Sequence, residues 1–373
     1  MKMIDISVEI ISPVIVYPPT HISGSALRGA LAAKYIQNHH IADPSQDYDF
    51  QNLFLNEQVI YSDLVPGGLV LPLTAMSCKR RPGFKEEGRH GVYDALFANI
   101  TSTVPINCPE CGQDLKRLEG YHDFNRVQKL ETSVSTHVGI DRITSTAAPE
   151  ILYSDAEIDE GQMLHGKIYA PEAYIPRLIE LLEGDFYVGR SKTRGKGKVR
   201  VVSATVADWD LDTMRLSWEM WNHKAKIMLG KMWRWDFLFS VTLHSDVIIV
   251  DEFLRASNDL SDDVRWLPKA AMQECKFGDG TIEFVGRFCQ LDRISGWNSA
   301  HKLPKNDDFC IRRGSVFIYG FTGNEADKLQ LQDKLIEMSF NGIGLRRSEG
   351  FGRIVINDSF HSDYAGGDFS CTE

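Results

Sequence analysis

The sequence contains no apolar run long enough to cross a lipid bilayer, which argues against a membrane protein. Its first residues, MKMIDISVEIISPV, also lack the basic start and the long apolar block of a secretory leader. They alternate apolar and polar side chains, as a half-buried β-strand does. We therefore expect a cytoplasmic protein with no role in a membrane.

A basic excess is missing as well, because 41 Lys and Arg residues stand against 51 Asp and Glu residues and leave a net charge of −10. Proteins that coat nucleic acid indiscriminately need positive charge to neutralise phosphate, so this class is excluded. The charge is unevenly distributed, however. Residues 35–78 contain five acids and no Lys or Arg, whereas residues 188–201 contain six bases and no acid. A basic island on an acidic chain indicates a phosphate site, and a solvated turn is the alternative interpretation.

Cysteine is scarce, with seven residues scattered over 373 positions, and this odd number favours reduced thiols over a disulfide framework. One pair is an exception. Cys108 and Cys111 stand in the stretch CPECG, with the spacing that lets a tight turn aim two thiolates at one zinc ion. Cys78 and His90 are the best candidates for the remaining ligands, and His122 is an alternative fourth ligand. Four ligands leave no open position for water, so the predicted zinc site is structural. A knuckle without metal is the alternative.

A glycine-rich block occurs twice, as VGRSKTRGKGKVRV over residues 188–201 and as IGLRRSEGFGRIVI over residues 343–356. The glycines that keep the same spacing in both blocks are Gly189 with Gly344, Gly195 with Gly350, and Gly197 with Gly352. Glycine adopts positive φ and has no Cβ, so such a loop lets the backbone approach a phosphate while neighbouring bases supply charge. The repeat therefore predicts one glycine-rich loop of the same kind in each half of the chain.

Each block follows a predicted strand and a predicted helix. Residues 162–170 and 314–321 have strand character, and residues 173–183 and 325–338 have helical character. A β-type run follows each block. This order is the closing half of a βαββαβ unit, so we predict an α+β protein with two ferredoxin-like (RRM-like) domains that carry glycine-rich loops.

The predicted domain boundaries follow from these units. The first ferredoxin-like domain covers residues 1–206 and the second covers residues 236–357. Within the first, residues 63–130 are irregular and are predicted to be an insertion that contains the zinc knuckle. Residues 132–161 have two β-type segments around a turn signal and predict a long β-hairpin.

The two remaining segments differ in character. Residues 207–235 are predicted to be a helical linker, rich in tryptophan, whose indoles either pack inside the protein or form a surface for a partner. Residues 358–373 have the composition of a disordered tail.

Several stretches, in this order, resemble the RAMP superfamily of CRISPR effector proteins: SGSALRGALA, HGVYDAL near CPEC, HVGIDRITSTA, GWN and LPK before GSVF, and GLRRSEGFGRI. The resemblance spans nearly the whole chain and is closest to the cap subunit of type III-D complexes. It implies a non-catalytic RNA-binding subunit that holds the 5′ repeat-derived handle of the crRNA in antiviral defence. It also implies docking to the large cyclase-like subunit and to RAMP backbone subunits, with only indirect contact to target RNA. The hairpin would be the thumb that separates handle from spacer.

The resemblance places RNA against both glycine blocks and the hairpin. The first block, with six bases, is expected to hold phosphate, whereas the second, with three bases and Glu349, is expected to shape the site or to stack. Phe351 stacks on a base or closes the loop as a core aromatic. The three bases after Cys78 form a metal-held patch or a solvated charge run. The expected RNA-binding residues are Arg28, Lys79, Arg80, Arg81, His137, Arg142, Arg190, Lys192, Arg194, Lys196, Arg346, Arg347 and Phe351.

Three other functions compete with this prediction. A RAMP endoribonuclease uses a histidine near the first helix as general base, and His21 occupies such a place, but no local partner for it is evident. Asp141 is a candidate for metal-dependent cleavage, although one carboxylate is thin support for a metal site. A sequence-general protein of two RRM-like units lacks the usual aromatic signature here. We therefore expect no catalytic residues and no enzyme activity.

Overall fold

The computed structural model describes residues 1–85, 88–103, 107–140, 146–208, 210–298 and 303–365, which form a mixed α+β structure of antiparallel sheets and helices. The chain divides into two compact units. One is formed by Met1–Gly68 with Gln128–Asp208, and the other by Leu69–Val127 with Trp209–Glu373. In the part of the chain so described, no helix combines the length and the apolar character that a membrane span requires.

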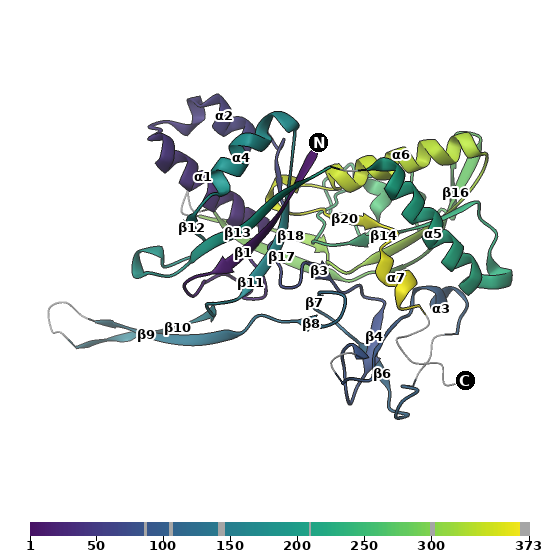
Figure 1. The fold of residues 1–373 in the computed structure, drawn as a ribbon, viewed down its shortest axis with the longest axis horizontal. Coiled ribbons are helices and arrows are strands. Elements are labelled where there is room, and N and C mark those ends of the chain that lie inside the picture. Colours follow the sequence, from purple (N-terminus) through teal and green to yellow (C-terminus); the bar gives the residue numbers. More distant parts are fainter. Residues whose placement is uncertain (86–87, 104–106, 141–145, 209, 299–302, 366–373) are drawn as a thin grey trace. The chain divides into compact units, whose positions relative to one another are not determined.

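The first unit is built on a five-stranded sheet with the order β12-β13-β1-β11-β2 (Figure 1). The central strand β1 (Lys2–Ile10) pairs antiparallel with β11 (Met163–Ala170) and with β13 (Lys198–Ala207). Every second residue of β1 from Ile4 to Ile10 is buried, as its alternating sequence predicts. The edges are β2 (Ile60–Tyr61) and β12 (Asp185–Tyr187).

Two helices share a core with the buried face of this sheet. The first, α1 (Gly24–His39), begins at Ser23, whose hydroxyl accepts a hydrogen bond from the backbone N–H of Ala26 at 3.3 Å. The second, α4 (Ile175–Leu182), buries four apolar side chains at helical spacing. The short turns η1 (Pro44–Gln46), α2 (Tyr48–Phe50) and η2 (Gln51–Leu55) follow α1, and η4 (Glu172–Tyr174) precedes α4.

A hairpin of β9 (Thr132–Ile140) and β10 (Ala147–Ile158) belongs to the first unit and lies within the range predicted for one. Side chains alternate between its two faces. One face carries Ser133, Ser135 and His137 opposite Glu157, Asp155 and Tyr153. The other face carries exposed apolar residues, among them Val134, Val138 and Leu152.

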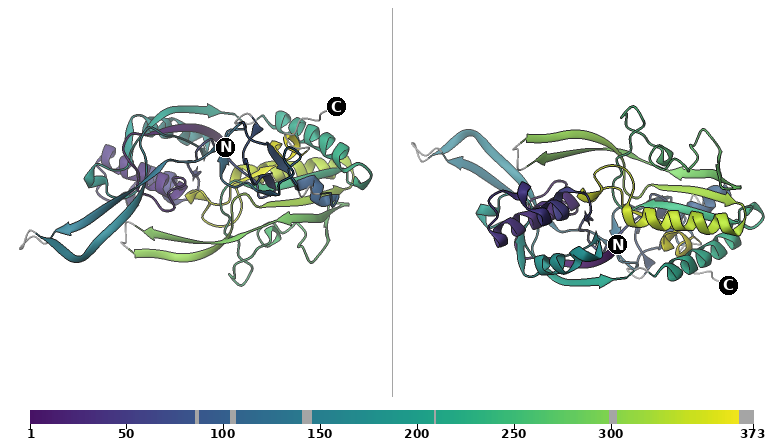
Figure 2. Two further views of the ribbon diagram at one scale, coloured as in Figure 1. Left: turned by 90° about the horizontal axis from the view of Figure 1, so that it is seen from below. Right: turned by 90° about the horizontal axis from the view of Figure 1, so that it is seen from above.

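The second unit is built on a sheet with the order β15-β16-β19-β14-β20. All seven residues of β14 (Phe237–Leu243) are buried. The reason is that both faces of this strand are covered: Phe239 packs in one core with α6 (Glu325–Asn341), and Leu238 packs in another with α5 (Leu211–Leu229) (Figure 2). A strand covered on both faces has a continuous apolar sequence instead of an alternating one.

The other strands of this sheet are β15 (Glu274–Phe277), β16 (Gly280–Phe288), β19 (Val316–Thr322) and β20 (Ile354–Ile356). The strand β14 ends at Leu243, and after it Val247, Ile248 and Val250 form only isolated bridges. The helix predicted for the linker ends at Leu229, where Gly230 adopts positive φ. Its tryptophans Trp218 and Trp221 are buried, as is Trp235 beyond it.

A second hairpin, which the sequence did not predict, is formed by β17 (Leu291–Asn298) and β18 (Leu303–Ile311). It extends from the sheet of the second unit (Figure 2). Its sequence alternates only weakly, and a bulge lies between Ile294 and Gly296, so the period-two signal of a hairpin is lost.

The segment predicted to be an insertion of the first domain packs instead in the second unit, over Leu69–Val127. It contains the short elements β3 (Leu69–Val70), β4 (Ala75–Cys78), β5 (Val92–Asp94), α3 (Leu96–Ile100), β6 (Leu115–Arg117), β7 (Tyr121–His122) and β8 (Val127–Gln128). The backbone N–H of Leu73 donates to the carbonyl of Gly314 at 2.7 Å. Phe97 of α3 also packs against Trp221 of α5.

The chain after residue 358, predicted to be a disordered tail, forms the helix α7 (Ser359–Asp363). Phe360 and His361 are buried there, because they close the core over the 69–127 segment. His361 Nδ1 lies 3.1 Å from Asp94 Oδ2, and its Nε2 lies 2.8 Å from the hydroxyl of Thr242 in β14. Three separate parts of the chain are thus joined by one buried polar cluster. Residues 366–373 lie outside the described part.

This cluster makes stability depend on pH. Burial lowers the pKa of His361, but the carboxylates of Asp94 and Asp358 together raise it more, so the folded pKa lies above the usual value. The stabilising contribution is therefore present below the unfolded pKa of about 6.5 and is lost as the pH rises through the folded value. We expect His361→Ala to destabilise the second unit more at pH 6 than at pH 9, measured by urea unfolding. The exposed His223 provides a control, and an equal loss at both pH values would contradict a charged pair.

Candidate nucleic-acid interface and metal centre

The two glycine blocks have the same backbone conformation. In the first, Gly189, Ser191, Gly195 and Gly197 all have positive φ, and a single 3₁₀ turn, η5 (Lys192–Arg194), lies between them. In the second, Gly344, Arg346, Gly350 and Gly352 have positive φ around η8 (Arg347–Glu349). Each position of one loop therefore has its counterpart in the other. We call residues 188–201 loop 1 and residues 343–356 loop 2.

Contacts within the chain explain two glycines of each loop. A Cβ on Gly189 would strike the carbonyl oxygen of Ile15, and one on Gly344 would strike that of Ile248. A Cβ on Gly197 or Gly352 would strike the carbonyl oxygen of Val188 or Ile343 in the same loop. The expected close approach of backbone to phosphate is therefore not what these glycines are needed for, since the chain itself occupies the space.

Backbone hydrogen bonds close both loops in the same way. Val188 N–H donates to Gly197 O at 2.8 Å, and Ile343 N–H donates to Gly352 O at 2.9 Å. The turn between the two bonded residues, η5 in loop 1 and η8 in loop 2, displays its side chains. Each loop thus has a base that is closed by a backbone hydrogen bond, and its turn displays those side chains.

The bases of loop 1 lie against β10 of the hairpin. Arg190 Nη2 lies 3.2 Å from Asp155 Oδ1, and Lys196 Nζ lies 2.5 Å from Glu157 Oε2. Arg194 Nη1 donates to the hydroxyl of Tyr153 at 2.7 Å. Lys192 differs, because burial lowers its pKa and no acidic partner of it occurs among the residues the structure describes. Three of the four predicted phosphate ligands therefore lie against β10, two of them paired with a carboxylate and Arg194 with a hydroxyl.

Loop 2 lies against β18 in a similar way. Arg346 Nη1 lies 2.7 Å from Asp308 Oδ2, and its Nη2 lies 2.8 Å from Glu349 Oε2. Lys305 Nζ of β18 lies 2.6 Å from the same Glu349 carboxylate. Burial raises the pKa of Glu349, but the hydrogen bonds and charges of Arg346 and Lys305 have the larger effect and lower the pKa to about 2.

The ring of Phe351 is in contact with another side chain of loop 2. The guanidinium carbon of Arg346 lies 4.8 Å from the centre of its ring. This contact agrees with the interpretation of Phe351 as an aromatic that closes loop 2. Arg347 donates to the carbonyl of Asn341 at 3.4 Å.

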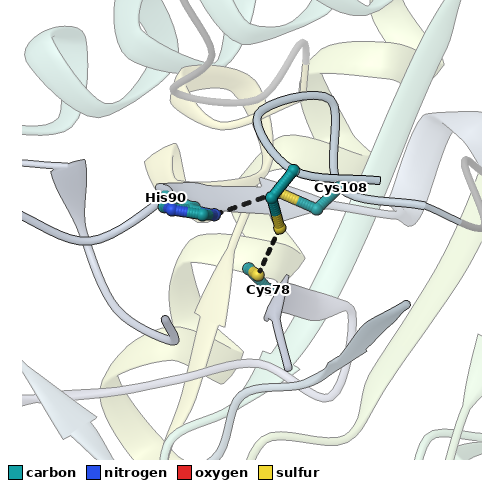
Figure 3. A group of neighbouring side chains, drawn as sticks. Cys78, His90 and Cys108 are labelled. Carbon is teal, nitrogen blue, oxygen red and sulfur yellow. Dashed lines mark hydrogen bonds between the residues drawn. The ribbon is translucent and has the colours of Figure 1, made fainter. Parts of the chain in front are cut away.

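The predicted metal ligands Cys78, His90, Cys108 and Cys111 come together, with their ligand atoms within 4.8 Å of one another. The side chains of Cys78, His90 and Cys108 point toward one another (Figure 3). Cys78 Sγ lies 3.5 Å from Cys111 Sγ, and Cys108 Sγ lies 3.5 Å from His90 Nδ1. Around a tetrahedral zinc with Zn–S of about 2.3 Å and Zn–N of about 2.0 Å, such atoms are about 3.5–3.8 Å apart. The residues fit a Cys₃His site that could hold a metal ion.

Backbone N–H groups beside the cluster favour a thiolate at Cys78, whereas burial raises the pKa of Cys108. Burial raises the pKa of Cys78. Hydrogen bonds from the backbone N–H groups of Arg81 and Arg80 and from the neighbouring thiols have the larger effect together and lower the pKa to about 7. Gly112 has positive φ, and its N–H donates to Cys108 O at 2.8 Å, which closes the knuckle turn. A thiolate is the form of cysteine that binds zinc.

His122, the alternative fourth ligand, lies elsewhere. It is buried among the rings of Phe84, Phe124 and Phe360, and its Nδ1 accepts a hydrogen bond from the N–H of Phe124 at 3.1 Å. Burial lowers its pKa to about 4, so it is a neutral core histidine.

The remaining predicted RNA ligands belong to different elements of the two units. Lys79, Arg80 and Arg81 are exposed beside the metal cluster. Arg28 is half-buried on α1 and acts electrostatically on Tyr61. His137 of β9 faces Tyr153 with ring centres 5.2 Å apart. Arg142 and Asp141 lie outside the described residues.

His21 is enclosed at the start of α1. Its residue is 8% exposed, its Nδ1 lies 3.0 Å from the hydroxyl of Thr20, and its Nε2 lies 3.7 Å from Asp63 Oδ2. Asp63 also accepts a hydrogen bond from the N–H of Gly24 at 2.8 Å, which ties it to the helix start. The partner of His21 was missed in the sequence because it lies far along the chain.

No protein-family model and no curated protein matches the chain. Similar solved structures include a CRISPR-associated protein Cas6, with 13% identity and a TM-score of 0.36 over 95% of this chain and 98% of that one. They also include a chain of the type III-B Cmr-beta complex bound to cognate target RNA, with 13% identity and a TM-score of 0.40 over 94% and 96%. The same complex with target RNA and AMPPnP gives 14% identity and a TM-score of 0.38 over 84% and 86%. Likeness at this level assigns no function to the chain.

The glycine contacts give a graded prediction. We expect Gly197→Ala to destabilise the first unit by more than about 3 kcal/mol, because it combines positive φ with a clash against Val188 O. Gly195 also has positive φ but has open space around its Cβ position, so Gly195→Ala should cost only about 1–2 kcal/mol. Urea unfolding of both variants tests this, and equal losses would show that the clash is relieved by the loop.

The metal cluster gives a second prediction. Elemental analysis of the purified chain should find about one zinc per molecule, and Cys108→Ser should lose it. Chelation should lower the melting temperature of wild type, since a structural metal contributes directly to folding. Cys289 lies outside the cluster, so Cys289→Ser should keep the metal. A metal-free wild type would end the zinc assignment.

Proposed function

We propose that this chain is a non-catalytic RNA-binding subunit of a type III CRISPR effector complex. The observation that carries the proposal is the doubled loop, in which two backbone traces with matching positive-φ positions each present basic side chains next to a hairpin. Closed loops that display Arg and Lys side chains suit a phosphate backbone, which is a repeating row of negative charges.

The strand order supports two ferredoxin-like (RRM-like) domains. In the first unit β13-β1-β11-β2 corresponds to the order 4-1-3-2 of a βαββαβ unit, with α1 and α4 as its helices. In the second unit β20-β14-β19-β16 has the same order, and α6 is the second helix. Between β14 and β16 the described residues form the turn η7 (Leu260–Asp262) and the short strand β15, but no α-helix, so the first helix of this unit is replaced by other structure.

In this proposal the chain is the cap subunit of a type III-D complex. Loop 1 and the β9–β10 thumb hold the 5′ handle of the crRNA, while the large cyclase-like subunit and the first backbone subunit dock on other surfaces. The zinc knuckle has a structural role, because all four ligands come from the protein and the ion supplies cross-linking of a segment with little core of its own.

The absence of catalysis is also part of the proposal. His21 is the residue placed like the general base of a RAMP endoribonuclease. A base must reach the 2′-hydroxyl whose proton it removes, and the burial of His21 against Thr20 and Asp63 favours a structural role at the start of α1. Its contact with Asp63 keeps the endoribonuclease as the second candidate.

One experiment separates the two functions. The purified chain is incubated with a labelled CRISPR repeat RNA, with and without Mg²⁺, and both binding and cleavage are measured. We expect binding without cleavage. Neutralising Arg190, Lys192 and Arg194 together should weaken binding at least tenfold and reduce the slope of log K against log salt by about two.

A matched triple variant of Arg215, Lys224 and Lys269, which removes the same charge from the second unit, should bind like wild type. Cleavage by wild type that disappears in His21→Ala would establish the endoribonuclease instead. Binding that is equally weak in both triple variants would show that only net charge matters.

A further inference from the structure

The predicted phosphate ligands of loop 1 already have partners, and these partners come from one face of one strand. Tyr153, Asp155 and Glu157 alternate along β10 and therefore project to the same side. Arg194, Arg190 and Lys196 lie against them in that order. The hairpin thus offers loop 1 a row of oxygen acceptors about 6.8 Å apart, the rise of two residues in a strand. An extended sugar–phosphate chain offers a comparable row.

The three contacts differ in how firmly they are held. The side chain of Arg190 is 71% exposed, so its pair with Asp155 is solvated and weak. Lys196 and Glu157 are 27% and 2% exposed, and Ser135 also donates a hydrogen bond to the Glu157 carboxylate. Separating that pair would leave a buried charge alone. The contacts of Arg190 and Arg194 are therefore exchangeable, whereas the Lys196–Glu157 pair is an anchor.

Loop 2 lacks the exchangeable kind of contact. Arg346 is 23% exposed, is held by the carboxylates of Asp308 and Glu349, and stacks on Phe351. It resembles the anchor of loop 1 and not the solvated pair of Arg190. The two loops share a backbone but differ in which of their cations are available.

We propose that Asp155 and Tyr153 of β10 act as an internal competitor for RNA, occupying Arg190 and Arg194 until the phosphate backbone displaces them. The inference rests on the proposed RNA-binding function and concerns regulation of the same site. Phosphate replaces Asp155 because a guanidinium binds it through two parallel hydrogen bonds, whereas Arg190 contacts Asp155 through one nitrogen. Lys192, which has no acidic partner among the described residues, provides the first contact.

Displacement has a consequence for the hairpin. Loss of two of the three contacts leaves β10 attached to loop 1 mainly through Glu157. RNA that enters loop 1 therefore loosens the outer part of β9–β10 while its base stays fixed. The hairpin becomes free to reposition only after phosphate has arrived.

The test compares two single variants that change charge equally. Asp155→Asn removes the competitor, and Asp5→Asn removes an acid of the same unit that pairs with Lys167, outside loop 1 on the strand pair β1–β11. Affinity for a labelled CRISPR repeat RNA is measured at several salt concentrations. Asp155→Asn should bind about two- to fivefold more tightly than wild type, the range expected for release of a solvated ion pair. Asp5→Asn should bind like wild type.

Tyr153→Phe is a second variant, because it removes only the hydroxyl that accepts from Arg194. It should also tighten binding, without any change of charge. Hydrogen exchange of β9–β10 in wild type should increase when the RNA is added.

The outcomes separate this inference from the proposed function. Tighter binding by Asp155→Asn alone supports competition, while weaker binding would show that Asp155 positions Arg190, and equal gains in both Asn variants would show a general charge effect. Either of the last two results overturns the inference but leaves RNA binding intact. If wild type does not bind the RNA, the proposed function fails for the free subunit. Binding by Asp155→Asn would then still support competition, and its absence would overturn it.

Discussion

The contact between a glycine and a carbonyl oxygen within each loop is the constraint on which the candidate interface depends. Gly197 lies on Val188 O and Gly352 lies on Ile343 O, so neither position has room for a side chain. Because the two ends of each loop are brought together there, the turn between them has one backbone path in both units. The basic side chains therefore extend from a backbone whose path is set by glycine contacts and backbone hydrogen bonds. Conformation and charge are set by different residues.

Local patterns in the sequence were enough to predict much of the fold. The strands and helices on either side of each glycine block appear close to their predicted bounds, because burial on one face leaves periods of two or 3.6 residues in the sequence. The cluster of Cys78, His90, Cys108 and Cys111 could be chosen because Cys and His are the usual ligands of structural zinc and all four lie in one irregular segment. The two-residue spacing between Cys108 and Cys111 identified two of these four residues.

What could not be predicted depends on pairs that are distant in the chain. Nothing near Arg190 indicates that Asp155 will face it, since that contact requires the register of β10 against β9 and the position of the whole hairpin. His361 looked like part of a polar tail because its partners, Asp94 and Thr242, come from two other segments. The attachment of residues 69–127 to the second unit has the same origin, since hydrophobic contact between remote segments leaves no periodic signal.

The separation of frame and charge in the two loops also bears on how such a protein diverges. The positions that hold the backbone path are few and fixed, while the residues of η5 and η8 differ freely: Lys-Thr-Arg in one loop and Arg-Ser-Glu in the other. The two loops therefore share a backbone and differ in the side chains that they display. Substitutions within η5 or η8 can change the charge of a loop while the glycine contacts that fix its backbone stay the same.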